Sequence, residues 1–151
     1  MSGAAVAFAA TLPTLLVAHN VADHWVQTSH QAALKGRPDW LGRWNCAKHV
    51  LSYTGVTSGA VALVWSVLGL AITPLGFVFG QVVSAITHYW ADRRFTLARF
   101  AELVGNAEFY RLGAPRTGKD DNPTLGTGSY VLDQAWHWLW LFVAALVTAL
   151  I

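Results

Sequence analysis

Three apolar stretches of this chain each carry a histidine and an aspartate four residues apart, and a fourth apolar stretch opens with a histidine. On an α-helix, residues four apart lie on one face, so each pair can present a nitrogen and a carboxylate oxygen to one point. An aspartate at the centre of a membrane helix costs roughly 2.5 to 3.5 kcal/mol. A chain that carries such groups on all its apolar segments must bring them to each other or to a ligand. The residues are His19 and Asp23, His49, His88 and Asp92, and Asp133 and His137.

The composition indicates an integral membrane protein with a single domain over residues 1–151. Of the 151 residues, 54% are hydrophobic and only 12% are charged, whereas soluble domains carry about 25% charged residues. The formal net charge of +2 is too small to favour a nucleic-acid partner, so membrane lipids are the expected partners. A homo-oligomer is compatible with the sequence.

Four segments are long enough to cross about 30 Å of hydrocarbon as helices. They predict an all-α fold, an integral membrane four-helix bundle. The Thr73-Pro74 dipeptide resembles an N-cap followed by proline at the first helical position. The first segment lacks the basic start of a signal peptide, so we expect it to be retained. The predicted helices span residues 3–27, 49–72, 74–92 and 130–151.

The link between the third and fourth helices divides into two parts. Residues 93–113 mix arginines with large apolar side chains and predict a short amphipathic helix in the headgroup region, broken at Gly105-Asn106. A soluble cap over the bundle is the alternative. Residues 114–129 are rich in glycine, proline and aspartate, and predict a loop that could serve as a lid.

The basic residues predict the topology. All ten lysines and arginines fall in two of the links between helices, and none lies at the termini or at the Thr73 turn. The positive-inside rule places both links in the cytoplasm and both termini outside, in a bacterial inner membrane. The basic residues are Lys35, Arg37, Arg43 and Lys48 in the first link, and Arg93, Arg94, Arg99, Arg111, Arg116 and Lys119 in the second.

This topology brings all seven histidines and aspartates named above to one depth, a turn or two from the cytoplasmic face. An isolated pair is usually a salt bridge or a helix–helix contact, but seven groups at one level favour a metal site. Imidazole and carboxylate suit zinc best, with manganese or iron as alternatives. The site is either dinuclear or holds one metal while a carboxylate acts as general base. The candidate catalytic groups are Asp23, Asp92 and Asp133.

Other polar residues near these ligands are candidates for orienting them or for contacting substrate. Two arginines after the third helix could hold an anionic headgroup, although an anchoring role at the cytoplasmic face explains them equally well. The full set is Gln27, Ser84, Tyr130, Gln134, Arg93 and Arg94.

The segments AHNVADHWVQTSHQA, THYWADRR and GTGSYVLDQAWHW together resemble a bacterial membrane family catalogued as domain of unknown function 3307, found in actinobacteria and their phages. The resemblance covers most of the chain. More distantly, the same pattern of residues is similar to inner-membrane proteins described as metal-dependent hydrolases. It implies a shared fold and site but assigns no reaction. The family motifs fall on His19, Asp23 and Gln27, on His49, on His88 and Asp92, and on Asp133, Gln134 and His137.

The pattern therefore predicts a membrane-embedded, metal-dependent hydrolase that acts on a lipid-linked or membrane-proximal substrate at the cytoplasmic leaflet. A metal or proton transporter is one alternative, although the outer halves of the helices are almost purely apolar. A membrane di-iron oxygenase is disfavoured, because such sites use about eight imidazoles and this chain has 6 histidines. A non-catalytic membrane protein, phage-related or structural, is the remaining alternative.

Overall fold

The computed structural model describes residues 2–115 and 127–151. Within these residues the chain forms α-helices and one π-helix and no strand, which confirms the all-α prediction. In chain order the elements are α1 (Gly3–Val21), η1 (Ala22–Val26), α2 (Ser29–Leu34), α3 (Trp40–Leu68), α4 (Pro74–Asp92), α5 (Phe95–Leu103), α6 (Ala107–Tyr110) and α7 (Gly128–Leu150).

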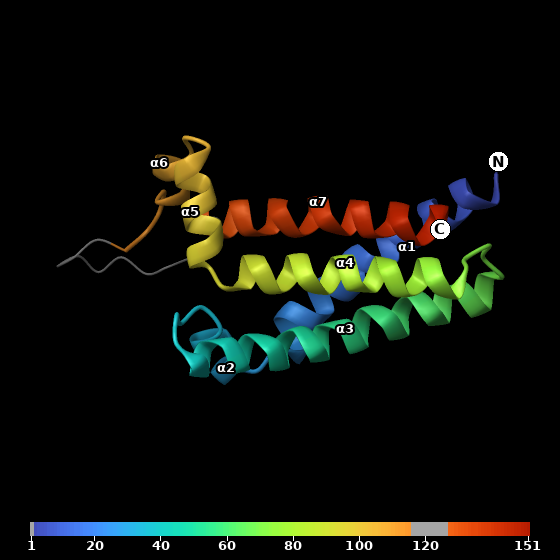
Figure 1. Cartoon of the computed structure of the whole chain (residues 1–151), viewed down its shortest axis with the longest axis horizontal. Coiled ribbons are helices and arrows are strands. Elements are labelled where there is room, and N and C mark those ends of the chain that lie inside the picture. The colour runs from blue at the N-terminus through green and yellow to red at the C-terminus, as the bar shows by residue number, and fades with distance from the viewer. Residues whose placement is uncertain (1, 116–126) are drawn as a thin grey trace.

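The four long helices α1, α3, α4 and α7 lie alongside one another (Figure 1). Helix α1 packs against α3 and α7, and α4 packs against the same two helices. The short helices α2, α5 and α6 gather at one end of this arrangement, whereas both termini lie at the other end. The described parts of the two links that carry basic residues therefore share one end of the molecule.

Three helical segments are long and apolar enough to cross a membrane: Gly3–Val26, Trp40–Leu68 and Gly128–Leu150. Their length and composition indicate a membrane protein. Helix α4 has 19 residues, about 28 Å of helix, but its buried face includes Gln81, Ser84, His88 and Asp92. A fourth span over α4 stays a prediction.

The first predicted helix, residues 3–27, changes its geometry before it ends. The α-helix stops at Val21, and residues Ala22–Val26 form a π-helix. Gln27 then leaves the helix with ψ 129°. Short π-helices occur inside longer helices at functional sites, and this one contains Asp23.

The predicted bounds of the second helix, 49–72, were wrong at both ends, because α3 runs from Trp40 to Leu68. The Asp39 side chain accepts a hydrogen bond from Gly42 N at 2.9 Å and caps the helix, which therefore starts nine residues before His49, at Trp40. This hydrogen bond lowers the pKa of the exposed Asp39 carboxyl below its usual range. Gly69 ends the helix at φ 59°, in the left-handed region. The apolar run marks the part of a helix that is suited to hydrocarbon. At its start, α3 extends beyond this run, to Trp40.

The third helix has the predicted bounds, Pro74–Asp92, and Thr73 caps it by accepting a hydrogen bond from Gly76 N at 2.9 Å. The fourth, predicted over 130–151, is α7, which begins two residues earlier, at Gly128, and ends at Leu150. Thr127 accepts a hydrogen bond from Tyr130 N and sets this start. Of the predicted loop over 114–129, residues 116–126 lie outside the described residues, and the last two belong to α7.

The two basic links contain the short helices. Helix α2 occupies a link for which we predicted no helix, and a capping box between Thr28 and Gln31 starts it. The segment 93–113 forms α5 and α6, separated at Gly105 with φ 81°, so the predicted break is confirmed. Helix α5 buries Leu97 and Ala101 and exposes Leu103.

The interior differs between the two ends of the long helices. Toward the termini it is apolar, with two clusters of buried side chains. Toward α2 and α5 the interior is polar. The four histidines predicted as ligands are buried there together with Asp92, namely His19, His49, His88 and His137. The apolar clusters are Ala7, Leu70, Ile72 and Ala149, and Leu15, Val61, Leu141, Ala144 and Ala145.

Candidate metal centre

The seven predicted ligands converge in one cluster at the end of the molecule that carries the short helices. They come from α1, η1, α3, α4 and α7. Each of the four histidines is at most 3% exposed. The carboxylates differ, with side-chain exposures of 3% for Asp92, 10% for Asp23 and 27% for Asp133.

Two histidines and two aspartates form the tightest part of the cluster. The Nε2 atoms of His49 and His88 lie 3.1 Å apart. Asp23 Oδ1 lies 3.4 Å from both nitrogens, and Asp92 Oδ2 lies 3.1 and 3.2 Å from them. Ligand atoms about 2.0 to 2.1 Å from a tetrahedral zinc lie about 3.3 Å from one another. These five separations therefore match the spacing of ligands around one zinc ion.

A second group lies next to the first. One ligand atom from each of Asp92, Asp133 and His137 falls within 4.8 Å of the others, and His137 Nε2 lies 3.6 Å from Asp133 Oδ1. This group shares no member with the set Asp23, His49 and His88, whose ligand atoms meet the same limit. Asp92 also lies beside His49 and His88, and a third set, His19, His88 and His137, meets the same limit. The cluster thus offers enough ligands for either one ion or two.

Several atoms in this cluster are buried without a hydrogen bond. Asp23 Oδ1, Asp92 Oδ2 and His137 Nε2 have no such partner among the described residues. Buried polar groups are nearly always hydrogen-bonded, and a buried carboxylate is costly unless a positive charge compensates it. For these two oxygens that charge is either a protonated histidine at 3.1 to 3.4 Å or a cation. The two oxygens lie beside imidazole nitrogens without the geometry of hydrogen bonds, an arrangement that suits a cation between them. The residues present therefore fit a divalent metal.

Lys35, which we predicted only as a cytoplasmic anchor, is part of the cluster. Its Nζ lies 2.7 Å from Asp92 Oδ1, and its side chain is 9% exposed. Asp92 therefore presents one oxygen to lysine and the other to His49 and His88. This ion pair fixes the orientation of the carboxylate and compensates part of the negative charge.

Two of the polar residues predicted to support the ligands, Gln134 and Ser84, make specific contacts. Gln134 Oε1 lies 3.4 Å from His19 Nε2, and Gln134 Nε2 donates to Asp133 Oδ2 at 3.3 Å. Ser84 touches no ligand directly. The Ser84 hydroxyl forms a hydrogen bond with the Tyr53 hydroxyl, with 2.7 Å between the two oxygens. The Tyr53 ring in turn stacks on the His88 ring, with ring centroids 3.9 Å apart. Ser84 therefore acts on His88 through Tyr53.

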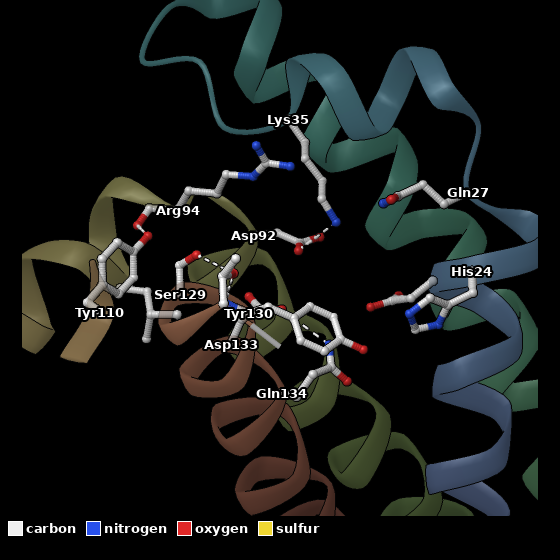
Figure 2. A pocket seen from close by; sticks show the side chains of 13 residues that line it. His24, Gln27, Lys35, Asp92, Arg94, Tyr110, Ser129, Tyr130, Asp133 and Gln134 are labelled. Carbon is white, nitrogen blue, oxygen red and sulfur yellow. Dashed lines mark hydrogen bonds and ion pairs between the residues drawn. The ribbon is translucent and has the colours of Figure 1, made fainter. Parts of the chain in front are cut away.

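A cavity of about 510 Å³ leads from the cluster to the surface. Figure 2 shows Lys35 joined to Asp92 by their ion pair on the cavity wall, Arg94 and Tyr110 at one side, and Tyr130 projecting from α7 toward the side where His24 lies. Burial raises the pKa of Tyr110. The wall includes Asp23, Asp92 and Asp133 together with the predicted contacts Gln27, Arg94, Tyr130 and Gln134.

Arg93 does not line this cavity, contrary to its prediction as a headgroup contact. It is 4% exposed, and its guanidinium donates to the Arg37 carbonyl, tying the end of α4 to the residues that follow α2. Arg94 follows with φ 56°, a conformation that turns the chain and lets its side chain reach the cavity wall.

Sequence reasoning missed Lys35, Tyr53 and Tyr110 as members of the site. Tyr53 could have been found, because it lies four residues after His49 and so shares its helix face. Lys35 and Tyr110 come from short helices at the ends of the links, and no spacing relates them to the ligands.

No family model, no curated protein and no solved structure matches this chain. The resemblance to domain of unknown function 3307 therefore rests on its motif residues and stays a prediction.

Proposed function

We propose that this chain is a membrane-embedded, metal-dependent hydrolase that acts on a lipid-linked or membrane-proximal substrate at the cytoplasmic leaflet. One observation carries the proposal. Carboxylate oxygens of Asp23 and Asp92 are buried without hydrogen bonds, at ligand spacing from two imidazole nitrogens. If the cluster only held the helices together, these oxygens would be expected to accept hydrogen bonds.

The proposed cofactor is zinc, with manganese or iron as alternatives that accept the same ligands. The ligands are His19, Asp23, His49, His88, Asp92, Asp133 and His137. Since Asp23, His49 and His88 share no member with Asp92, Asp133 and His137, two ions can be held. His19 is the remaining ligand, and its ligand atom lies within 4.8 Å of those of His88 and His137.

A divalent cation supplies Lewis-acid chemistry, which polarises the bond to be cleaved. The protein must also activate a water molecule and protonate the leaving group. Among the three proposed catalytic carboxylates, Asp133 is the most exposed, at 27%, and it lines the cavity. If the site holds a single ion on the other ligands, Asp133 is the carboxylate best placed to take a proton from the attacking water and return it to the leaving oxygen, while Asp23 and Asp92 stay in the cluster as ligands.

The proposed topology places α1, α3, α4 and α7 across a bacterial inner membrane, as a four-helix bundle with both termini outside. Helix α4 is 19 residues long, close to the 20 that a span requires. Its polar face is turned to the other three helices, where an ionisable residue is tolerated in a membrane. The segment of α5 and α6 then lies at the cytoplasmic headgroups.

A transporter of metal or protons is less well supported. Such proteins bind near the middle of the membrane and open toward both sides. In this chain the interior toward the termini is filled by Leu15, Val61, Leu141 and their neighbours. A one-sided centre fits this interior better than a conduit, and a liposome flux assay separates the two functions.

The proposal is tested by metal content. Protein purified in detergent without chelators is expected to contain one or two zinc ions per chain by elemental analysis. His88→Ala removes a member of the central group and should reduce the bound metal to half or less. The matched control is His30→Ala, because His30 is exposed on α2 and should leave the content unchanged. Wild-type protein without stoichiometric metal would refute the proposal.

A further inference from the structure

A second hollow of about 490 Å³ lies beside the first, along α1 and η1. Its wall is formed by apolar side chains from these two elements, together with Asn20, His24 and Tyr130. The apolar members are Leu16, Val17, Val21 and Trp25. We refer to this hollow as the lateral groove.

The lateral groove faces the surroundings of the protein rather than its interior. Val17 is 65% exposed and Trp25 is 87% exposed, yet both belong to the segment Gly3–Val26, which can cross a membrane. In a membrane these side chains contact hydrocarbon, so the groove can accept a lipid chain without exposing it to water.

The groove and the polar cavity are adjacent. His24 and Tyr130 line both of them, and Figure 2 shows these two residues on opposite sides of the cavity opening, one from the α1 side and one from α7. A molecule with a polar head and an apolar chain can therefore occupy both spaces at once, with its junction between His24 and Tyr130.

The polar cavity offers donors for an anionic head. Arg94 and Lys35 line its wall with the hydroxyl groups of Tyr110, Tyr130 and Ser129. A guanidinium matches the geometry of phosphate oxygens. The carboxylates of Asp23, Asp92 and Asp133, which also line this cavity, would repel an anion, and a divalent cation held by them reverses this effect.

We propose that the site takes a lipid with a phosphate headgroup, which reaches it sideways from the membrane between α1 and α7 and leaves its hydrocarbon chain in the lateral groove. The assignment of this lipid as substrate rests on the proposed function. Its binding does not require hydrolysis and can be measured separately. A water-soluble phosphoester shares the headgroup chemistry but leaves the groove empty.

The test uses a phosphatidic acid probe with a photoreactive diazirine in the middle of one acyl chain. Zinc-loaded full-length protein is placed in vesicles of phosphatidylethanolamine and phosphatidylglycerol that contain the probe. After irradiation, the labelled residues are mapped by mass spectrometry. We expect labels concentrated on residues 16–25. Uniform labelling that also covers Leu51 and Ile86, which are exposed on α3 and α4, would show bulk lipid contact only and overturn the inference.

Two matched pairs of variants sharpen the result. Val17→Trp fills the groove and should remove most of the labelling, whereas Ile86→Trp adds the same side chain elsewhere and should not. Arg94→Gln should weaken the preference for phosphatidic acid over a diacylglycerol probe by about tenfold, the worth of one hydrogen bond to a charged group. Arg99→Gln is its control, since Arg99 is exposed outside the cavity. Equal effects of a variant and its control would refute the assignment.

Competition experiments distinguish a lipid headgroup from a water-soluble phosphoester as the source of the phosphate. Excess glycerol phosphate should leave the labelling of residues 16–25 nearly unchanged, and efficient displacement would favour a soluble ligand instead. Metal content and hydrolysis are scored on the same preparations. Groove labelling without hydrolysis would refute the enzyme and retain the lipid site. Hydrolysis without groove labelling would refute only the present inference.

Discussion

Lys35 is the residue whose position most alters the electrostatics of the cluster. It brings a buried positive charge to within 2.7 Å of Asp92, where three aspartates meet within one small volume. An ion pair in this environment is costly to form and more costly to break, because the remaining charge is then buried alone. The pair therefore keeps Asp92 ionised and oriented when no cation is present.

The Lys35→Met variant is expected to destabilise the metal-free protein by about 3 kcal/mol, the usual cost of breaking a buried ion pair. Added zinc should recover part of this loss, since a cation replaces the missing charge. Thermal unfolding in detergent, with chelator and with zinc, measures both effects. The control is Lys48→Met, because Lys48 is exposed and lies over the Trp44 ring at 6.0 Å. Equal losses for the two variants would contradict this role for Lys35.

Sequence reasoning reached the ligands but not all of their surroundings. Residues such as His88 and Asp92 could be predicted because helix periodicity relates positions four apart. Arg93 and Arg94 show the limit, since the two neighbours look equivalent in sequence. The Arg93 side chain lies in the interior, whereas the Arg94 side chain lines the cavity. The chain turns between the two at Arg94, where φ is 56°.

At the scale of elements, the approach of α4 to α7 fixes the depth at which their two ligand pairs meet. Gly80 lies at the contact, and a Cβ built there would fall 2.9 Å from the Ala144 carbonyl oxygen and closer still to Thr148 Oγ1. Such proximity is available only to glycine. The backbones can then pack closely, as small residues allow in membrane helices.

Gly80→Ala is expected to destabilise the protein by about 1 to 3 kcal/mol, because α4 and α7 must move apart to admit the methyl group. The matched variant is Gly59→Ala on α3, where an added Cβ meets nothing within 4 Å. It should be neutral or stabilising by up to about 1 kcal/mol through helix propensity. The unfolding midpoints of the two variants, compared with that of the wild type, test this prediction. A Gly80→Ala variant with the wild-type midpoint would exclude close packing at this contact.

The helix boundaries show why element prediction succeeded in some places and failed in others. Helix α4 was predicted to the residue, because Thr73 and Pro74 mark its start in the sequence. The start of α3 was missed by nine residues, because Asp39 caps a polar helical extension that hydropathy assigns to the link. The π-helix Ala22–Val26 has no local signal of its own, since its hydrogen bonds reach one residue further than those of an α-helix.

At the scale of the whole molecule, the arrangement of the ends is the feature that can be tested in cells. The short helices and basic links occupy one end, and both termini occupy the other (Figure 1). The proposed topology, based on the positive-inside rule, orients this axis with the basic end in the cytoplasm. In that orientation the proposed metal site lies near the cytoplasmic face.

Cysteine labelling in intact cells tests this orientation. Ser2→Cys is expected to react with a membrane-impermeant maleimide added outside, whereas His30→Cys on α2 should react only after permeabilisation. Both positions are exposed, and the native Cys46 is buried and should stay unlabelled in both states. The opposite pattern would invert the topology, and reaction of both variants from outside would contradict an even number of spans.

The cluster takes its members from helices at both extremes of the chain, with His19 near the start and His137 near the end. During synthesis, the first helix therefore enters the bilayer carrying a histidine and an aspartate whose partners do not yet exist. An aspartate at the centre of a membrane helix costs roughly 2.5 to 3.5 kcal/mol, and Asp23 meets His49 and His88 only after α3 and α4 have followed. A fragment truncated before α3 is therefore expected to be less stable in the membrane than the whole chain and more readily degraded by quality-control proteases.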